Sequence, residues 1–304
     1  MDWNSILTEE RNPDTLDIDT LTTLDMVRRI NREDKKVAES VEEQLEEIAK
    51  AVDIIAGRME SGGRLVYIGA GTSGRLGVLD AAECPPTFSA DPSQVVGLIA
   101  GGERAMFTAI EGAEDSDSLG EEDLKRIGFC DRDVAVGIAA SGRTPYVIGA
   151  LKYARSTGAP TIGVSCCPGS EITRITDVSI SPSPGPEVIT GSTRMKSGTA
   201  QKMVLNMLST CAMIRLGKVY GNLMVDVKAS NEKLIHRCER IVAVATGMSE
   251  EQAAECLSRC GYRSKTAIVM HLKQVDAAEA DRLLMENGGR IAAVMADQDL
   301  PTSA

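Results

Sequence analysis

The first strong pattern along the chain is a stripe of apolar residues that recur every three or four positions. Its members are Val37, Val41, Leu45, Ile48, Val52, Ile55 and Met59. Acidic residues and lysines fill the positions between them, so the spacing predicts an amphipathic helical segment with one buried face. Gly62 and Gly63 follow the stripe and end the helical pattern. We expect residues 1–60 to form an N-terminal helical segment that packs on the core of the protein.

After these glycines the pattern changes to short apolar runs that alternate with helical patterns. The runs are Leu65–Ile68, Val95–Ala100, Val134–Ala139, Thr161–Val164 and Val178–Ile180. The candidate helices between and after them cover residues 73–82, 104–110, 146–156 and 170–175. This alternation predicts an α/β fold, a doubly wound five-stranded parallel sheet with helices on both faces. Such sheets bind ligands at the carboxyl ends of their strands.

The last third of the chain is helical. A largely apolar pattern over residues 198–216 predicts a buried or interface helix, and a further helix is expected over 229–246. Three shorter helical patterns follow, at 249–260, at 264–272 and at 277–295 with a break at Asn287-Gly288-Gly289. We therefore expect residues 61–246 to form the sheet domain and residues 247–304 a small three-helix domain.

Composition excludes several classes of partner. The formal net charge of the 304 residues is -11, which argues against nucleic acid because phosphate backbones bind surfaces rich in lysine and arginine. No run approaches the roughly 20 apolar residues that a membrane helix needs. The eight cysteines form no CxxC pair, and the two histidines, His236 and His271, lie far apart. These features predict a reduced, cytoplasmic protein with no structural metal.

Glycine and hydroxyl residues gather in three loops that follow predicted strands. They are Gly69–Arg75, Ser141–Thr144 and Thr190–Thr199. Glycines let the backbone approach a phosphate closely, and the helix that follows offers unpaired amides and a partial positive charge. Hydroxyls add further donors. Because the pattern recurs on more than one strand, it favours a phosphate group held between helix starts, above simple N-capping by Ser73, Ser141 and Thr144.

The segment Gly69-Ala-Gly-Thr-Ser-Gly74 also fits the G-x-G-x-x-G fingerprint of dinucleotide-binding proteins. That fingerprint requires an acidic residue about 20 positions further on, at the end of the second strand. Here the second strand is followed by Gly101-Gly102-Glu103, and Glu103 comes late. We therefore expect no cofactor and keep a nicotinamide cofactor as the weaker alternative.

Two glutamates lie close to these loops. Glu83 ends the first predicted helix, before Cys84-Pro85-Pro86, where the double proline predicts an irregular loop. Glu114 lies past the helix expected after the second strand. Most glutamates are solvated surface residues, and spacing alone does not set these two apart from Glu111 or Glu121.

Four strings of the sequence together resemble the N-acetylmuramic acid 6-phosphate etherases, a family of SIS (sugar isomerase) proteins. They are Thr8–Pro13, Gly69–Arg75, Asp80–Thr87 and Thr193–Thr199, and the similarity runs over nearly the whole chain. The resemblance implies an SIS-domain fold, a small C-terminal helical domain and a homodimer with its pocket near the subunit contact. It also implies cleavage of the D-lactyl ether of N-acetylmuramic acid 6-phosphate, which gives N-acetylglucosamine 6-phosphate and D-lactate in cell-wall sugar recycling.

The resemblance also implies roles for individual residues. Glu83 and Glu114 match the catalytic pair of the family, and no metal or redox cofactor is needed. The residues expected to hold the 6-phosphate, by analogy with other SIS domains, are Thr72, Ser73, Ser141 and Thr144. The cations on the right loops to bind the lactyl carboxylate are Arg75, Arg143, Arg194 and Lys196.

Three other functions fit parts of the pattern. An aldose–ketose isomerase of the SIS class would also take a proton from C2 but has no ether to cleave. A non-catalytic regulator that binds sugar phosphates, like the glucokinase regulatory protein, has two SIS domains, and this chain has room for one. A transcription regulator should open with a basic helix-turn-helix, which the acidic N-terminus disfavours.

Overall fold

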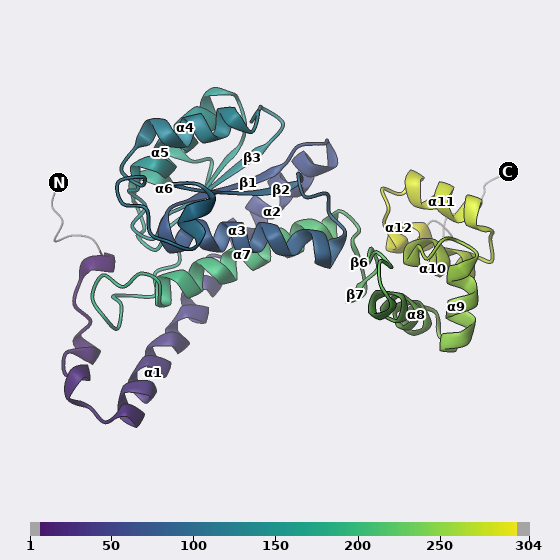
Figure 1. The fold of residues 1–304 in the computed structure, drawn as a ribbon, viewed down its shortest axis with the longest axis horizontal. Coiled ribbons are helices and arrows are strands. Elements are labelled where there is room, and N and C mark those ends of the chain that lie inside the picture. The colour runs from purple at the N-terminus through teal and green to yellow at the C-terminus, as the bar shows by residue number, and fades with distance from the viewer. Residues whose placement is uncertain (1–6, 297–304) are drawn as a thin grey trace. The chain divides into compact units, whose positions relative to one another are not determined.

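The computed structural model describes residues 7–296 and divides into two compact units (Figure 1). The first unit holds the chain up to Ala82 together with Pro92–Thr210. The second unit holds Glu83–Asp91 together with the chain from Cys211 onward.

The first unit is built on a five-stranded, all-parallel sheet. Its strands are β1 (Leu65–Gly69), β2 (Val95–Ile99), β3 (Val134–Ile138), β4 (Thr161–Val164) and β5 (Val178–Ile180). The strand order is β2-β1-β3-β4-β5, and the register brings the carboxyl ends of all five strands to one edge. The predicted fold class is therefore confirmed. The connections leave in opposite directions from β1 and β3, which makes the space between these strand ends the switch point where such sheets bind ligands.

Helices cover both faces of this sheet (Figure 1). The helices of this unit are α1 (Thr23–Glu42), α2 (Leu45–Glu60), α3 (Gly71–Phe88), α4 (Asp117–Arg126), α5 (Pro145–Ser156), α6 (Glu171–Ile175) and α7 (Lys196–Arg215), with 3-10 helices at Leu7–Glu9, Pro13–Thr15, Ile18–Thr20 and Glu103–Met106. Side chains alternate along β1: Val66 and Ile68 share a buried cluster with α5, whereas Tyr67 faces Gly77 of α3. Both faces of β1 are thus buried under helices, as the continuous apolar runs predict.

Several elements differ from the sequence-based expectation. The prediction of an irregular loop after Glu83 is wrong, because α3 continues through Pro85 and Pro86 to Phe88. The two prolines remove two amide donors close to the helix end, and the buried side chains of Cys84 and Phe88 anchor the last turn. The helix expected over 104–110 is only the short 3-10 turn Glu103–Met106, and α4 was not expected at all.

The second unit is a helical unit with a short hairpin. Its elements are β6 (Val219–Tyr220), β7 (Leu223–Met224), α8 (Glu232–Thr246), α9 (Glu250–Ser258), α10 (Ser264–Lys273), α11 (Ala277–Glu286) and α12 (Ile291–Ala296). Cys238 and Val242 of α8 are buried in one cluster with Leu257, Ile268 and Leu284. Helix α8 therefore shares its core with the C-terminal helices, whereas the sequence analysis drew the limit after it, at residue 246.

Two features of residues 7–296 bear on possible partners. None of the helices there is both long enough and apolar enough to span a bilayer. Over the same residues, His, Cys, Asp and Glu side chains nowhere gather in a group of three that could hold a metal ion.

Candidate active site

The turn from β1 into α3 forms one wall of the switch point. Gly71 adopts φ +53°, a conformation that favours glycine. A Cβ at Gly69 would lie 2.6 Å from the amide nitrogen of Gly74, so the turn is too tight for a side chain there. The amides of Gly71, Thr72 and Ser73 have no hydrogen-bond acceptor within the described chain. The start of α3 therefore presents three free donors, as a phosphate site requires.

Helix α7 packs against this turn and contributes polar groups that the sequence analysis did not single out. The Ser73 hydroxyl donates to Gln201 Oε1 at 2.9 Å, and a Cβ at Gly198 would lie 3.4 Å from the Thr72 methyl group. Gln201 Nε2 and Ser197 Oγ are buried, and neither has a partner among the described residues. Ser197 and Gln201 are four residues apart on a mostly apolar helix, so they lie on the same face of it. That spacing is the signal in the sequence that could have identified them.

The loop from β3 into α5 forms the opposite wall. The Ser141 hydroxyl accepts a hydrogen bond from the Arg143 amide at 3.3 Å. Thr144 is the N-cap residue of α5, but its hydroxyl makes no capping bond and stays available. The Arg143 guanidinium is partly exposed and has no carboxylate within ion-pair distance in residues 7–296. The loop thus offers two hydroxyls and one uncommitted cation.

Glu114 lies between these two walls. Its carbonyl oxygen accepts from the Tyr146 amide at 3.0 Å, which fixes its backbone at the start of α5. Glu114 also lines a cavity of about 130 Å³ together with Gly71, Arg75, Ala100 and other residues of the loops that follow β1 and β2. Arg75 Nε is held by the Met106 carbonyl at 3.1 Å. The structure therefore brings a carboxylate, a cation and the free amides of α3 to the same strand edge.

Glu83 is an exposed residue on α3, about three turns after Gly71. It belongs to the second unit, and Glu114 belongs to the first. Within the described residues the Glu83 carboxylate makes no hydrogen bond or ion pair.

Lys196 does not join these loops, because its ammonium is buried elsewhere. Its Nζ donates to Glu33 Oε2 at 2.7 Å and to the Pro184 carbonyl at 2.9 Å, and both charged side chains are 1% exposed. A cation committed in this way is not free to bind a substrate carboxylate. The expectation that Lys196 belongs to the substrate-binding set is corrected accordingly.

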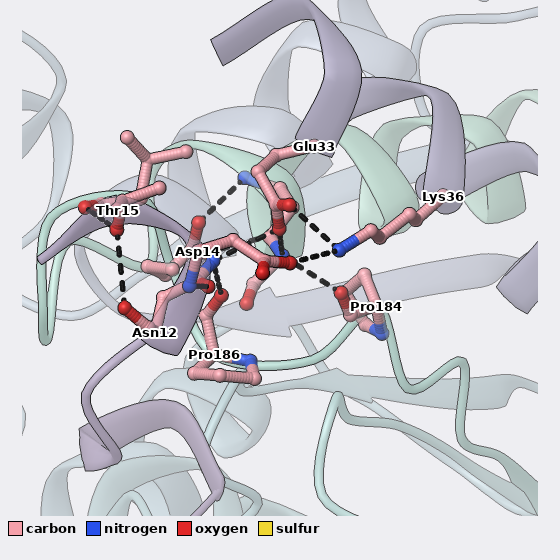
Figure 2. Close-up of polar contacts among 11 residues, drawn as sticks. Asn12, Asp14, Thr15, Glu33, Lys36, Pro184 and Pro186 are labelled. Carbon is pink, nitrogen blue, oxygen red and sulfur yellow. Dashed lines mark hydrogen bonds and ion pairs between the residues drawn. The ribbon is translucent and has the colours of Figure 1, made fainter. Parts of the chain in front are cut away.

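The surroundings of this ion pair explain two of the four recognisable strings. Asn12 donates to Glu33 Oε2 at 2.9 Å and to the Pro186 carbonyl at 3.1 Å, which ties Thr8–Pro13 to the loop before α7 (Figure 2). Burial alone would raise the pKa of Glu33, but hydrogen bonds from Lys196, Lys36 and Asn12 outweigh it and lower the pKa to about 2. Asn12, Glu33, Lys36 and Lys196 therefore form a charged cluster that holds the N-terminal segment against the start of α7. We call this cluster the joint around Glu33.

The start of α7 is capped by a buried carboxylate. Glu187 accepts from the amides of Lys196 and Ser197, each at 2.9 Å, and is fully buried. It satisfies two of the helix's free donors and complements the helix dipole. The joint around Glu33 and this cap together position the turn of α7 that contacts Thr72 and Ser73.

Two of the family matches lie mainly in the first unit, and a third lies in the second unit. The family described as glucokinase regulatory protein N-terminal SIS domain matches residues 47–155, and the SIS domain family matches residues 129–210. The C-terminal lid domain of glucokinase regulatory protein matches residues 221–276. Among solved structures, the phosphoheptose isomerase of Neisseria gonorrhoeae is similar in fold, with a TM-score of 0.50 and 21% identity over 63% of this chain and 98% of that one.

Curated relatives match over almost their whole length. N-acetylmuramic acid 6-phosphate etherase of Cronobacter sakazakii is 57% identical over 295 residues, which cover 97% of this chain and 99% of the relative. The etherase of Clostridium botulinum (strain Okra) is 58% identical over 288 residues, 95% of each chain. At this identity and coverage, the chain belongs to the N-acetylmuramic acid 6-phosphate etherase family.

Proposed function

We propose that this chain cleaves the D-lactyl ether of N-acetylmuramic acid 6-phosphate and releases N-acetylglucosamine 6-phosphate and D-lactate. Family membership supports the reaction, and the strand edge between β1 and β3 supports the location of the site. The observation that carries the site assignment is the cavity that joins Glu114 to the free amides at the start of α3.

The chemistry suits a site built from carboxylates. An unactivated ether resists cleavage because its leaving alkoxide is too basic. In the open-chain sugar the C3–O bond lies beta to the C1 aldehyde, so a base can remove the acidified C2 proton and lactate leaves by elimination. Water then adds at C3 of the unsaturated aldehyde. This route needs one base and one acid, and two carboxyl groups can divide these roles.

We assign Glu114 as the base at C2 and Glu83 as the acid that protonates the lactyl oxygen, then as the base for the incoming water. The exposed position of Glu114 in the cavity supports its role, because its carboxylate is open to a ligand there. Glu83 is assigned from the family pattern, and its lack of an internal partner leaves the carboxyl group free to act.

The 6-phosphate is assigned to the facing walls of the switch point. Thr72 and Ser73 contribute hydroxyls and amides from α3, and Ser141 and Thr144 contribute hydroxyls from the β3 loop. Arg143 is the cation assigned to the lactyl carboxylate, since it alone among the loop cations considered combines partial burial with a free guanidinium.

The test is to incubate the purified protein with the substrate and measure D-lactate, first in water and then in deuterated water. We expect lactate release and one deuterium at C2 of the sugar product. Glu114→Gln should lower kcat by at least about a hundredfold, the usual size of general-base catalysis, while sugar-phosphate binding persists. Glu121→Gln is the matched control, because Glu121 is partly exposed on α4 and paired with Lys125 at 2.6 Å.

Other outcomes identify the alternatives. Conversion of an aldose phosphate to a ketose phosphate without lactate release would identify an isomerase. Binding of the sugar phosphate with no turnover would identify a regulator, a function that the lid-domain match also allows. Lactate release with no label at C2 would contradict elimination.

A homodimer in the cytoplasm is the setting we propose. Leu16, Leu24 and Val27 expose more than half of their surface near the start of α1, which favours coverage by a second copy. All eight cysteines are unpaired, which favours a reducing compartment. Light scattering after size exclusion would test the dimer.

A further inference from the structure

The second unit has an opening at the start of α10. It is a cavity of about 740 Å³, large enough for a small phosphorylated metabolite. All the residues that line it belong to the second unit, and the proposed reaction assigns a role to none of them.

The start of α10 lacks a cap. The N-cap residue is Arg263, whose side chain makes no capping hydrogen bond. The amides of Ser264, Lys265 and Thr266 have no acceptor in the part of the chain that the structure describes, and all three residues line the cavity. A ten-residue helix that opens in this way presents free donors and a partial positive charge.

The hydroxyl of Ser264 is a second, independent feature. Ser264 is 2% exposed and lines the cavity, yet its Oγ has no hydrogen-bond partner among the described residues. A buried hydroxyl without a partner costs stability, so a native structure retains one where a ligand or water completes it.

The charges around the cavity are mostly positive. Lys218 and Lys265 both bind the single carboxylate of Asp226, at 2.9 and 2.8 Å, so one positive charge remains unbalanced. Lys228 also lines the cavity and has no carboxylate within ion-pair distance in residues 7–296. Arg263 is already neutralised by Asp281 at 2.6 Å. The lining therefore carries a surplus of about two positive charges.

We propose that this cavity binds a phosphate monoester, with the phosphate at the start of α10 between the Ser264 hydroxyl, Lys265 and Lys228. Three amides, one hydroxyl and two surplus charges match a dianion with three terminal oxygens. A carboxylate would use fewer of these donors and one of the charges. The remaining volume holds the organic part of the ester.

The direct test is amide NMR of the full-length, isotope-labelled protein at pH 7.5 and constant ionic strength. Titration with inorganic phosphate and with glucosamine 6-phosphate should shift the amides of Ser264, Lys265 and Thr266 saturably, and acetate should not. The amides of Gly71–Ser73 report binding in the first unit separately. Failure of etherase activity would thus leave this test intact, and the reverse also holds.

Three variants sharpen the test. Ser264→Ala should weaken phosphate binding at α10 about tenfold or more, because it removes a donor to a charged group. Lys228→Ala should weaken it about two- to fivefold, as expected for an exposed charge. Lys273→Ala, at the other end of the same helix and outside the cavity, should bind like the unmodified protein.

Thermal unfolding separates a ligand role for Ser264 from a structural one. Without phosphate, Ser264→Ala should melt at the same or a higher temperature, because the lost hydroxyl has no partner in the free protein. The proposal is overturned if the three amides do not respond saturably to phosphate. It is also overturned if Ser264→Ala and Lys228→Ala bind phosphate as tightly as Lys273→Ala.

Discussion

The buried ion pair between Glu33 and Lys196 makes a quantitative prediction. Lys196→Met keeps the length and the apolar stem of the side chain but removes the ammonium that donates to Glu33 at 2.7 Å. Glu33 then remains buried with Lys36, at 2.6 Å, and Asn12 as its donors. A carboxylate that loses its main counter-charge in a dry environment becomes costly to keep ionised.

The magnitude follows from the pKa of Glu33. Its fall from an ordinary 4.5 to about 2 corresponds to about 3 kcal/mol of stability at neutral pH. Removing one partner of a buried pair typically costs about 3–5 kcal/mol, and the remaining donors favour the lower end of this range. For a unit of this size the melting temperature should fall by roughly 6–12 °C.

Urea unfolding across a pH series is the assay. The pKa of Glu33 is depressed in the folded protein, so its contribution is complete above pH 4.5 and is lost as the pH falls toward 2. In Lys196→Met the pKa of Glu33 rises, and the acid-sensitive range should move to higher pH. Lys202→Met is the matched control, because Lys202 is an exposed lysine on the same helix, bonded only to Asn206 at 3.2 Å.

A loss of less than about 1 kcal/mol in Lys196→Met would refute this reasoning, since a surface ion pair contributes that little. An unchanged stability with a raised KM for the etherase substrate would be more informative still. It would return Lys196 to the substrate carboxylate, as the sequence pattern suggested.

Three further predictions concern the sheet unit. Gly149→Ala should cost about 1–3 kcal/mol in urea unfolding, because its Cβ would overlap the Asp117 carbonyl; an unchanged midpoint would show that α4 can move aside. Asp133→Ala should lower the free energy of unfolding by about 3 kcal/mol in the same assay, because Arg64 then loses the carboxylate that binds it at 2.7 Å. A loss of stability seen only at low salt would instead mark the pair as a surface ion pair. Burial raises the pKa of Cys166 to about 12, so iodoacetamide at pH 8 should leave this thiol unmodified in the folded protein. Peptide mass spectrometry measures the modification, and labelling at the rate of a free thiol would contradict the burial of Cys166.

The strands were predictable because both faces of the sheet are covered. Each appears in the sequence as a continuous apolar run, and the observed bounds differ from the runs by at most one residue at the carboxyl end. The parallel order then follows from the alternation with helices.

Helix α4 was not predictable from apolar spacing, because it packs mainly through backbone. Only Leu119 and Leu124 are large apolar residues in Asp117–Arg126. A Cβ at Gly120 would overlap the Tyr146 carbonyl, and the Gly149 Cβ would do the same to Asp117, so α4 and α5 approach at glycines. Such a contact leaves no stripe with a period of 3.6 residues.

The candidate site was predictable where a particular backbone geometry requires a particular residue type. Glycine and hydroxyl patterns located the loops after β1 and β3, because tight turns and free helix starts require them. The ion pair between Lys196 and Glu33 could not be seen in the sequence, because Glu33 lies 163 residues earlier and looks like an ordinary surface acid on α1. Long-range pairing of charges leaves no local trace in a sequence.

That separation has a consequence for biosynthesis. At about 5–20 residues per second, roughly 8–33 s pass between translation of Glu33 and translation of Lys196, 163 residues later. Throughout this interval a nascent chain carries Glu33 on α1 without Lys196, its buried partner. Helix α1 should thus be made well before its docking site is complete, and slow translation would lengthen its exposure to proteases.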